Sequence, residues 1–183
     1  MNEELEVLKM VTQRLDKENI PYFVSGSMAA NYYTLPRMTR DIDVVIELKT
    51  ADIDKFVKLF KDDFYVEEET IREEVNRRGM FNLIHKEYVV KLDFILRKAT
   101  DFQTSTFARR RKVVIENSPM WLISEEDLVL AKLLWAKDSH SELQLKDVSN
   151  LLGAKKDLDR KYISEWIKNM DLDQVYKKVK DVE

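Results

Sequence analysis

The sequence predicts an α+β fold: a small mixed β-sheet with helices on one face, followed by a C-terminal helical region. Three observations lead to this prediction. Apolar residues near the N-terminus recur at helical spacing, short alternating segments follow between residues 22 and 115, and the pattern turns helical from Ser124 onward. At 183 residues the chain is long enough for one domain with a small appendage. We expect the sheet-containing core over residues 1–118 and the helical region, packed on it, over 119–183.

The first elements are a helix, a strand and a second helix. An amphipathic helix is predicted from the spacing of Leu5, Leu8, Val11 and Leu15. It ends before Ile20-Pro21, because the residue that precedes a proline disfavours helical geometry. Tyr22-Phe23-Val24 is short, aromatic and β-branched, which favours a strand, and Ser25-Gly26-Ser27 then turns the chain into a helix.

Residues 41–48 alternate in the manner of a strand. Ile42, Val44 and Ile46 share one face, whereas Asp41 and Asp43 share the other. A helix over 51–60 is expected next, with Thr50 as its N-cap.

The middle of the chain predicts hairpin-connected antiparallel strands. The candidate strands are Phe64–Thr70, Ile71–Asn76, Met80–Ile84, Tyr88–Leu96 and Val113–Ile115. Ser124 and Asp127 then fit a capping box for a long helix. Further helices are predicted near 142–152, 159–169 and 171–181.

Composition excludes several kinds of function. The formal net charge is −3, so no overall positive field attracts nucleic acid or an anionic membrane. There are no cysteines, which removes disulfides, thiolate nucleophiles and zinc–thiolate sites. Imidazole ligands could come only from His85 and His140, which lie far apart in sequence. No signal or membrane segment is recognisable, and the cytoplasm is the expected location.

Three aspartates are the leading candidates for chemistry. Asp41 and Asp43 leave the same face of their predicted strand, and Asp93 leaves the non-core face of another apolar strand. Three carboxylates that meet repel one another unless divalent cations compensate, and oxygen ligands without sulfur favour Mg²⁺ or Mn²⁺. The alternatives are that the Asp pair is a solvated strand end and that Asp93 pairs with Lys91 or a nearby arginine.

Basic and glycine-containing segments could bind phosphates. Gly26 and Ser27 stand at a strand-to-helix junction, where free backbone N–H groups suit a phosphate, although such a turn can also be purely structural. Arg37 or Arg40 could clamp a triphosphate. Lys132 lies on an apolar helix face and either reaches a phosphate or carboxylate or extends its amine to the surface. The run 109–112 could contact nucleic acid or form a solvated basic edge.

Together these motifs resemble the polymerase-beta-like nucleotidyltransferase superfamily. The matching segments are Phe23-Val24-Ser25-Gly26-Ser27, Arg37-Met38-Thr39-Arg40-Asp41-Ile42-Asp43-Val44 and Lys91-Leu92-Asp93-Phe94. The second segment looks like that of small bacterial nucleotidyltransferases of abortive-infection and toxin systems. Lys132 followed by Lys146-Asp147 is similar to a later segment of such enzymes, although Asn150 stands where relatives often have a further aspartate.

The resemblance implies an activity and roles for these residues. Gly26 and Ser27 would contact nucleotide phosphates, with Arg37, Arg40 and Lys132 as further candidates. Asp41 and Asp43 would bind metal, and Asp93 would complete the site as metal ligand or general base. The implied reaction moves a nucleoside monophosphate from an NTP such as ATP to a hydroxyl of RNA, protein or a small molecule, and releases pyrophosphate. The alternative is a non-catalytic nucleotide- or protein-binding regulatory module, for example an antitoxin-like one. A toxin–antitoxin partner is a further expectation.

Overall fold

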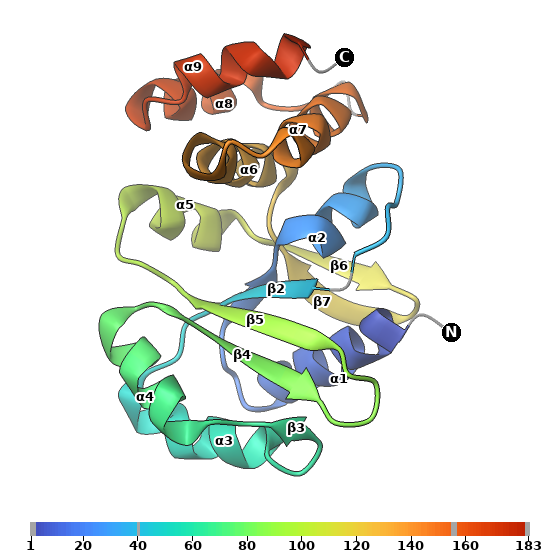
Figure 1. Cartoon of the computed structure of the whole chain (residues 1–183), viewed down its shortest axis with the longest axis vertical. Coiled ribbons are helices and arrows are strands. Elements are labelled where there is room, and N and C mark those ends of the chain that lie inside the picture. The colour runs from blue at the N-terminus through green and yellow to red at the C-terminus, as the bar shows by residue number, and fades with distance from the viewer. Residues whose placement is uncertain (1–2, 40, 155–156, 182–183) are drawn as a thin grey trace.

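The computed structural model describes residues 3–39, 41–154 and 157–181. Its centre is a seven-stranded mixed sheet with the strand order β3-β4-β5-β2-β1-β7-β6 (Figure 1). The strands are β1 (Tyr22–Val24), β2 (Asp41–Ile46), β3 (Phe64–Tyr65), β4 (Met80–His85), β5 (Lys91–Leu96), β6 (Arg111–Ile115) and β7 (Ser118–Leu122). The predicted α+β class is confirmed.

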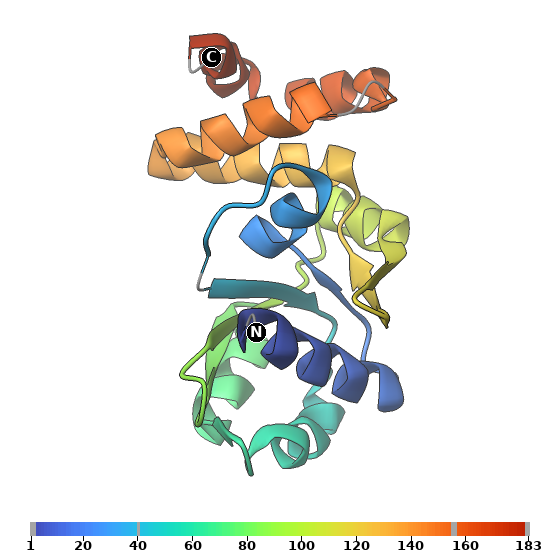
Figure 2. The same ribbon diagram turned by 90° about the vertical axis from the view of Figure 1, so that its right-hand side faces the viewer.

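Helices lie around the sheet and beyond one end of it. They are α1 (Glu3–Lys17), α2 (Gly26–Tyr33), α3 (Ile53–Phe60), α4 (Glu68–Arg77), α5 (Asp101–Arg109), α6 (Glu125–Ser139), α7 (Glu142–Ala154), α8 (Arg160–Asn169) and α9 (Asp173–Lys177), with 3₁₀ turns at Thr50–Asp52 and Lys178–Asp181. In Figures 1 and 2, α1, α3 and α4 lie below the sheet and α2 and α5 above it, with α6 to α9 stacked beyond them. None of the helices in the described ranges has the length and apolar character needed to cross a membrane.

The central strand pairs decide where the site forms. β2 runs antiparallel to β1 but parallel to β5. β4 is antiparallel to β5, as the hairpin prediction requires. Because β2 and β5 are parallel neighbours, their N-terminal ends lie at the same edge of the sheet. That edge carries the aspartates.

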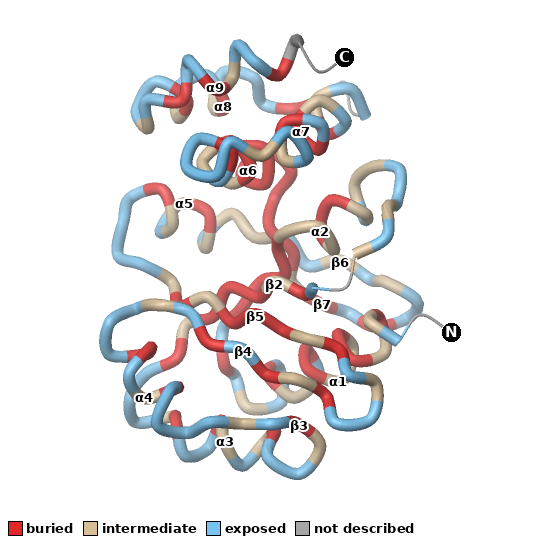
Figure 3. The backbone as a smooth tube through the Cα atoms, viewed as in Figure 1, coloured by how far each residue is buried: buried red, intermediate tan, exposed pale blue. Residues whose placement is uncertain are grey.

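The core between the sheet and α3 is aromatic. Phe81 and Phe94 stack across β4 and β5 with 5.3 Å between ring centroids, and Phe56 of α3 meets both edge-on. Burying one such side chain contributes about 1.5–3 kcal/mol. Figure 3 shows buried residues along β2 and β5, and all three residues of β1 are buried as well. These strands are therefore a rigid base for side chains on the opposite face.

The C-terminal helices begin at a capped residue. The Ser124 hydroxyl accepts a hydrogen bond from the Asp127 amide and donates one to the Asp127 carboxylate at 2.6 Å, which confirms the predicted cap. Immediately before it, β7 pairs with β1 and joins residues 118–122 to the sheet. The proposed division into a core over 1–118 and a helical region over 119–183 stays a prediction.

Three segments differ from their predictions. The predicted strand Ile71–Asn76 is wrong, because these residues lie in α4, where Ile71 and Val75 bury together one helical turn apart. Of Phe64–Thr70, only Phe64–Tyr65 is a strand. The predicted Thr50 cap is also wrong: Lys49 and Asp52 occupy the N-cap positions, and neither makes a side-chain cap hydrogen bond. Helix α5 and strand β7 had no counterpart in the sequence analysis.

Candidate active site

Asp43 and Asp93 are neighbours in the sheet. They are register partners in the parallel pair β2–β5, and Asp41 is paired with Lys91 in the same way. Residues that face each other across adjacent strands point to the same side, about 4.5–5.5 Å apart at their Cβ atoms. Residues far apart in sequence are thus brought to one face, as the sequence analysis expects.

Asp43 has the most perturbed carboxyl group of the site. Burial, followed by the charge of Asp93, raises the pKa of Asp43 to about 6, while the ammonium of Lys132 acts in the opposite direction. The charge of Asp41 adds to the increase. A bound cation would stabilise the ionised form of this carboxylate, because it would offset the repulsion from the neighbouring carboxylates.

Asp93 has one oxygen in a hydrogen bond and one without a partner. Its side chain is buried, at 8% exposure. Its Oδ2 accepts a hydrogen bond from Lys91 Nζ at 2.8 Å, which is the pairing that the sequence left open. Its Oδ1 has no hydrogen-bond partner among the described residues. A buried oxygen without a partner is costly and points to a missing ligand.

These residues suit a hard divalent cation in their chemistry. The donors are carboxylate oxygens, one of them without a partner, as Mg²⁺ or Mn²⁺ requires. Within the described ranges, no group of three or more acidic or imidazole side chains lies close enough to hold a metal ion. The three-aspartate metal site therefore stays a prediction, with Asp41, Asp43 and Asp93 as its candidate ligands.

Gly26 is required by its contact with Asp43. Its φ is +59°, and a Cβ at this position would lie 1.8 Å from Asp43 Oδ2. The Ser25 amide also donates to the Asp43 carbonyl at 2.9 Å. The first turn of α2 therefore lies directly against the catalytic candidate, and the Ser25 side chain makes no cap hydrogen bond there. Backbone N–H groups and the helix dipole can serve a phosphate at this end.

Replacing Gly26 with alanine is expected to displace Asp43. The left-handed backbone and the collision should together destabilise the fold by about 1–2 kcal/mol and weaken nucleotide binding. Thermal denaturation and titration with NTP and Mg²⁺ measure the two effects. Gly153→Ala is the matched control, because nothing lies within 4 Å of its added Cβ. Equal behaviour of the two variants would contradict the close contact.

A polar cluster links α2 to the C-terminal helices. Arg37 donates from Nη2 to Ser27 Oγ at 2.7 Å and to Asp147 Oδ2 at 2.9 Å, and from Nε to Asp147 Oδ1 at 3.1 Å. Lys132 Nζ donates to the same Asp147 at 2.7 Å and to Gln144 at 3.0 Å. One carboxylate thus orients both predicted phosphate-binding cations. Arg40, the other clamp candidate, lies outside the described residues.

Burial makes this cluster sensitive to loss of a member. Lys132 is 4% exposed, so its amine does not extend to the surface. Burial lowers the pKa of Lys132, which the hydrogen bond to Asp147 opposes. For Asp147, burial acts to raise the pKa, but the hydrogen bonds from Arg37 and Lys132 lower it overall. Sequence analysis gave Asp147 no role of its own; its only signal was the Lys146-Asp147 pair.

The basic run 109–112 makes contacts with carboxylates and aromatic rings of the same chain, although Arg111 and Lys112 are exposed. Arg109 pairs with Glu126 and Asp127 at 3.2 Å each, and Arg111 also reaches Glu126. Arg110 lies over the rings of Phe107 and Trp121. The run joins α5, β6 and α6 and is not brought together with the aspartates.

Comparison with known proteins identifies the fold. A scan against protein-family models and a search of curated proteins both give no match. Solved structures do match. A nucleotidyltransferase-like antigenic protein from Paracoccidioides brasiliensis aligns with a TM-score of 0.57 at 20% identity, over 96% of this chain and 93% of that one. The chain has the nucleotidyltransferase fold.

Two further solved structures share this nucleotidyltransferase fold. The resistance factor ANT(2'')-Ia aligns with a TM-score of 0.62 at 12% identity, over 92% of this chain and 91% of that chain. A lincosamide antibiotic adenylyltransferase with bound lincomycin aligns with a TM-score of 0.55 at 16% identity, over 85% of this chain and 98% of that chain. Each likeness spans most of both chains.

Proposed function

We propose that the protein is a metal-dependent nucleotidyltransferase, which moves a nucleoside monophosphate from an NTP to a hydroxyl acceptor and releases pyrophosphate. The observation that carries the proposal is the pairing of Asp43 with Asp93 on adjacent parallel strands, with the glycine at the start of α2 against Asp43. A charge-rich cluster of this kind can stabilise phosphoryl chemistry by position and electrostatics, without a covalent nucleophile.

Binding of the nucleotide would involve both sides of the site. The N-terminal turn of α2, with Gly26 and Ser27, offers backbone N–H groups to the phosphates. Arg37 already contacts Ser27, and Lys132 acts on Asp43 electrostatically, so both cations lie where phosphate charge would be neutralised. A divalent cation, when bound by Asp41 and Asp43, would supply Lewis-acid stabilisation of the developing phosphate charge.

Asp93 is the residue suited to the acceptor proton. Its carboxylate can accept a hydrogen bond from the acceptor hydroxyl and take the proton as the new O–P bond forms. Lys91, whose ammonium donates a hydrogen bond to Oδ2, orients the carboxylate. The bond between the α-phosphorus and the bridging oxygen breaks, and pyrophosphate carries that electron pair away.

The adenylyltransferase among the similar structures supports this reaction class. Preference for ATP, dependence on Mg²⁺ and a cytoplasmic location belong to the same proposal. Membership of the abortive-infection or toxin-system type, with a toxin–antitoxin partner, rests on the sequence motifs alone.

The direct test is transfer of label from each NTP, labelled at its α-phosphate, in a cell extract with Mg²⁺. Parent protein should transfer label and release pyrophosphate, and Asp93→Asn should lower the rate roughly 100-fold or more, the size expected for loss of a general base. Calorimetry should show NTP binding by both proteins. NTP binding without turnover by the parent would favour the non-catalytic regulatory module instead.

A further inference from the structure

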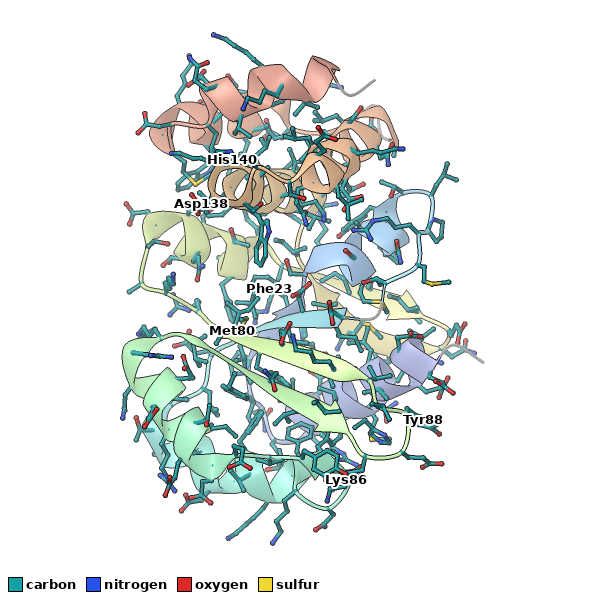
Figure 4. All side chains as sticks on the ribbon, in the orientation of Figure 1. Phe23, Met80, Lys86, Tyr88, Asp138 and His140 are labelled. Atoms are coloured by element: carbon teal, nitrogen blue, oxygen red, sulfur yellow. The ribbon has the colours of Figure 1, made fainter. Side chains whose placement is uncertain are left out.

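The face of the sheet that carries the aspartates continues beyond them over β5 and β4. Strand registers place side chains of this face in three cross-strand rows. These rows are Tyr65–Ile84–Lys91–Asp41, then Asn82–Asp93–Asp43, then Met80–Ile95–Val45–Phe23. Met80 and Phe23, the two ends of the third row, are labelled in Figure 4. We call residues 80, 82, 84 and 95 the acceptor face.

The acceptor face is apolar and open. Met80 is 49% exposed, Asn82 is exposed, and Ile84 and Ile95 are half-buried. The aromatic core and α3 occupy the opposite face of the same strands. Exposed apolar side chains that adjoin a reactive centre mark a binding surface rather than random surface composition. The surface begins at Ile95, on the same strand as Asp93, and continues onto β4.

Asn82 is the polar residue of the acceptor face. It is the register partner of Asp93 on the antiparallel strand, so both side chains leave the same side of the sheet. A carboxamide can both donate and accept a hydrogen bond. It can therefore orient a hydroxyl-bearing molecule beside the carboxylate of Asp93.

The charges around this face do not suit a polyanion. Lys91 is the basic residue within the three rows, and it is paired with Asp93. At the margin, Lys86 donates to the carbonyl groups of Lys61 and Asp62. The densest basic run, 109–112, ends in β6, at the far edge of the sheet from β4, and its Arg109 and Arg110 contact carboxylates and an aromatic ring of the same chain. RNA binding needs several cations free to contact phosphates.

From these observations we infer that the acceptor is a small hydroxylated molecule with an apolar side, uncharged or cationic, which lies on residues 80, 82, 84 and 95. This inference rests on the proposed nucleotidyl transfer. The acceptor oxygen attacks the α-phosphorus, its proton passes to Asp93, a phosphodiester forms, and pyrophosphate leaves with the electrons of the broken P–O bond. No other reactant is needed.

The test separates the acceptor by size and chemistry. A cell extract is divided into an ultrafiltrate, purified RNA and a protein fraction, and each is incubated with the protein, Mg²⁺ and each α-labelled NTP. Label is expected in the ultrafiltrate, in a product that remains after free nucleotide has been removed. Label in the RNA or protein fraction would overturn the inference about the acceptor. Absence of label from every fraction, with NTP binding intact, would also overturn it. Neither result would contradict the proposed binding of NTP.

Variants test the location of the acceptor. Met80→Asp should lower transfer to the ultrafiltrate about tenfold or more by placing a charge on an apolar contact, and Asn82→Leu should do the same. Both should bind NTP and Mg²⁺ as the parent does. Val114→Asp is the matched control, because Val114 is 64% exposed on β6, at the far edge of the sheet, and should leave transfer unchanged.

The combined results distinguish a wrong location of the acceptor from a failure of the proposed function. Unchanged transfer by both folded acceptor-face variants would place the acceptor elsewhere and overturn this inference. Absence of NTP binding by the parent, together with absence of label in every fraction, would contradict the proposed function itself. Thermal melting shows whether each variant is folded before its transfer is compared.

Discussion

Replacing Asp43 with asparagine is expected to abolish nucleotidyl transfer and, in the absence of divalent cations at neutral pH, to stabilise the fold. The loss of transfer should be roughly 10³-fold or more, as for removal of other electrostatic groups that act on the transition state. The gain in stability has a different origin. An asparagine carries no charge that burial and the carboxylates of Asp93 and Asp41 can penalise.

The stability effect of Asp43 has a definite pH window. The pKa of its carboxyl group rises from 3.8 in a free chain to about 6 in the fold. Between these values the folded state holds more protons than the unfolded state, so the stability of the parent falls as pH rises from about 4 to about 6. Below that window the carboxyl is neutral in both states. Above it the penalty is complete, about 2 kcal/mol after allowance for partial solvation.

Denaturant unfolding in a chelating buffer at several pH values measures this window. Asp43→Asn should unfold at a higher denaturant concentration than the parent above pH ~6 and at nearly the same concentration below pH ~4. Exposed Asp138, labelled in Figure 4, gives the control Asp138→Asn, which should change stability by less than about 0.5 kcal/mol. An Asp43→Asn variant that keeps its activity, or that is less stable than the parent at pH 7, would refute the assigned environment.

Replacing Asp147 with alanine should destabilise the protein more than any other single change discussed. The carboxylate accepts hydrogen bonds from Arg37 and Lys132, and it is only 5% exposed. Its removal leaves Lys132 buried without its ionic partner. The expected cost is about 3 kcal/mol in the free energy of unfolding, the usual size when one member of a buried ion pair is lost.

A double-mutant cycle identifies the cause of that loss. Lys132→Met combined with Asp147→Leu removes both buried charges and should be more stable than Asp147→Leu alone, because apolar groups of similar size can fill the space. Urea unfolding of the parent, the two single variants and the double variant measures the coupling. Additive effects would show that Lys132 and Asp147 do not depend on each other in the folded protein.

Periodicity along the chain predicted most elements near the aspartates. The alternation of Ile42, Val44 and Ile46 with Asp41 and Asp43 is local, so the strand and its polar face follow from the sequence. The same method failed for α4. Its segment is rich in charges, and its buried Ile71 and Val75 are too few to distinguish a helix from a short strand without a partner surface.

The contacts of the phosphate-binding candidates depend on how distant segments of the chain pack together. The Gly-Ser turn was recognised from its place between a strand and a helix, but its contact with Asp43 depends on how α2 packs against β2. Asp147, which binds both Arg37 and Lys132, lies 110 residues from Arg37. The sequence close to Asp147 does not predict its contacts with Arg37 and Lys132.

By itself, the sequence determined the fold class, the central strands and helices, and the three aspartates as candidates, because each depends on spacing between near neighbours. Tertiary structure alone decided that β2 and β5 run parallel with Asp43 opposite Asp93, that one oxygen of Asp93 has no hydrogen-bond partner among the described residues, and that Arg109 and Arg111 pair with carboxylates of α6. These features arise when distant segments pack together, and the free energy of that packing depends on surfaces that no single segment contains.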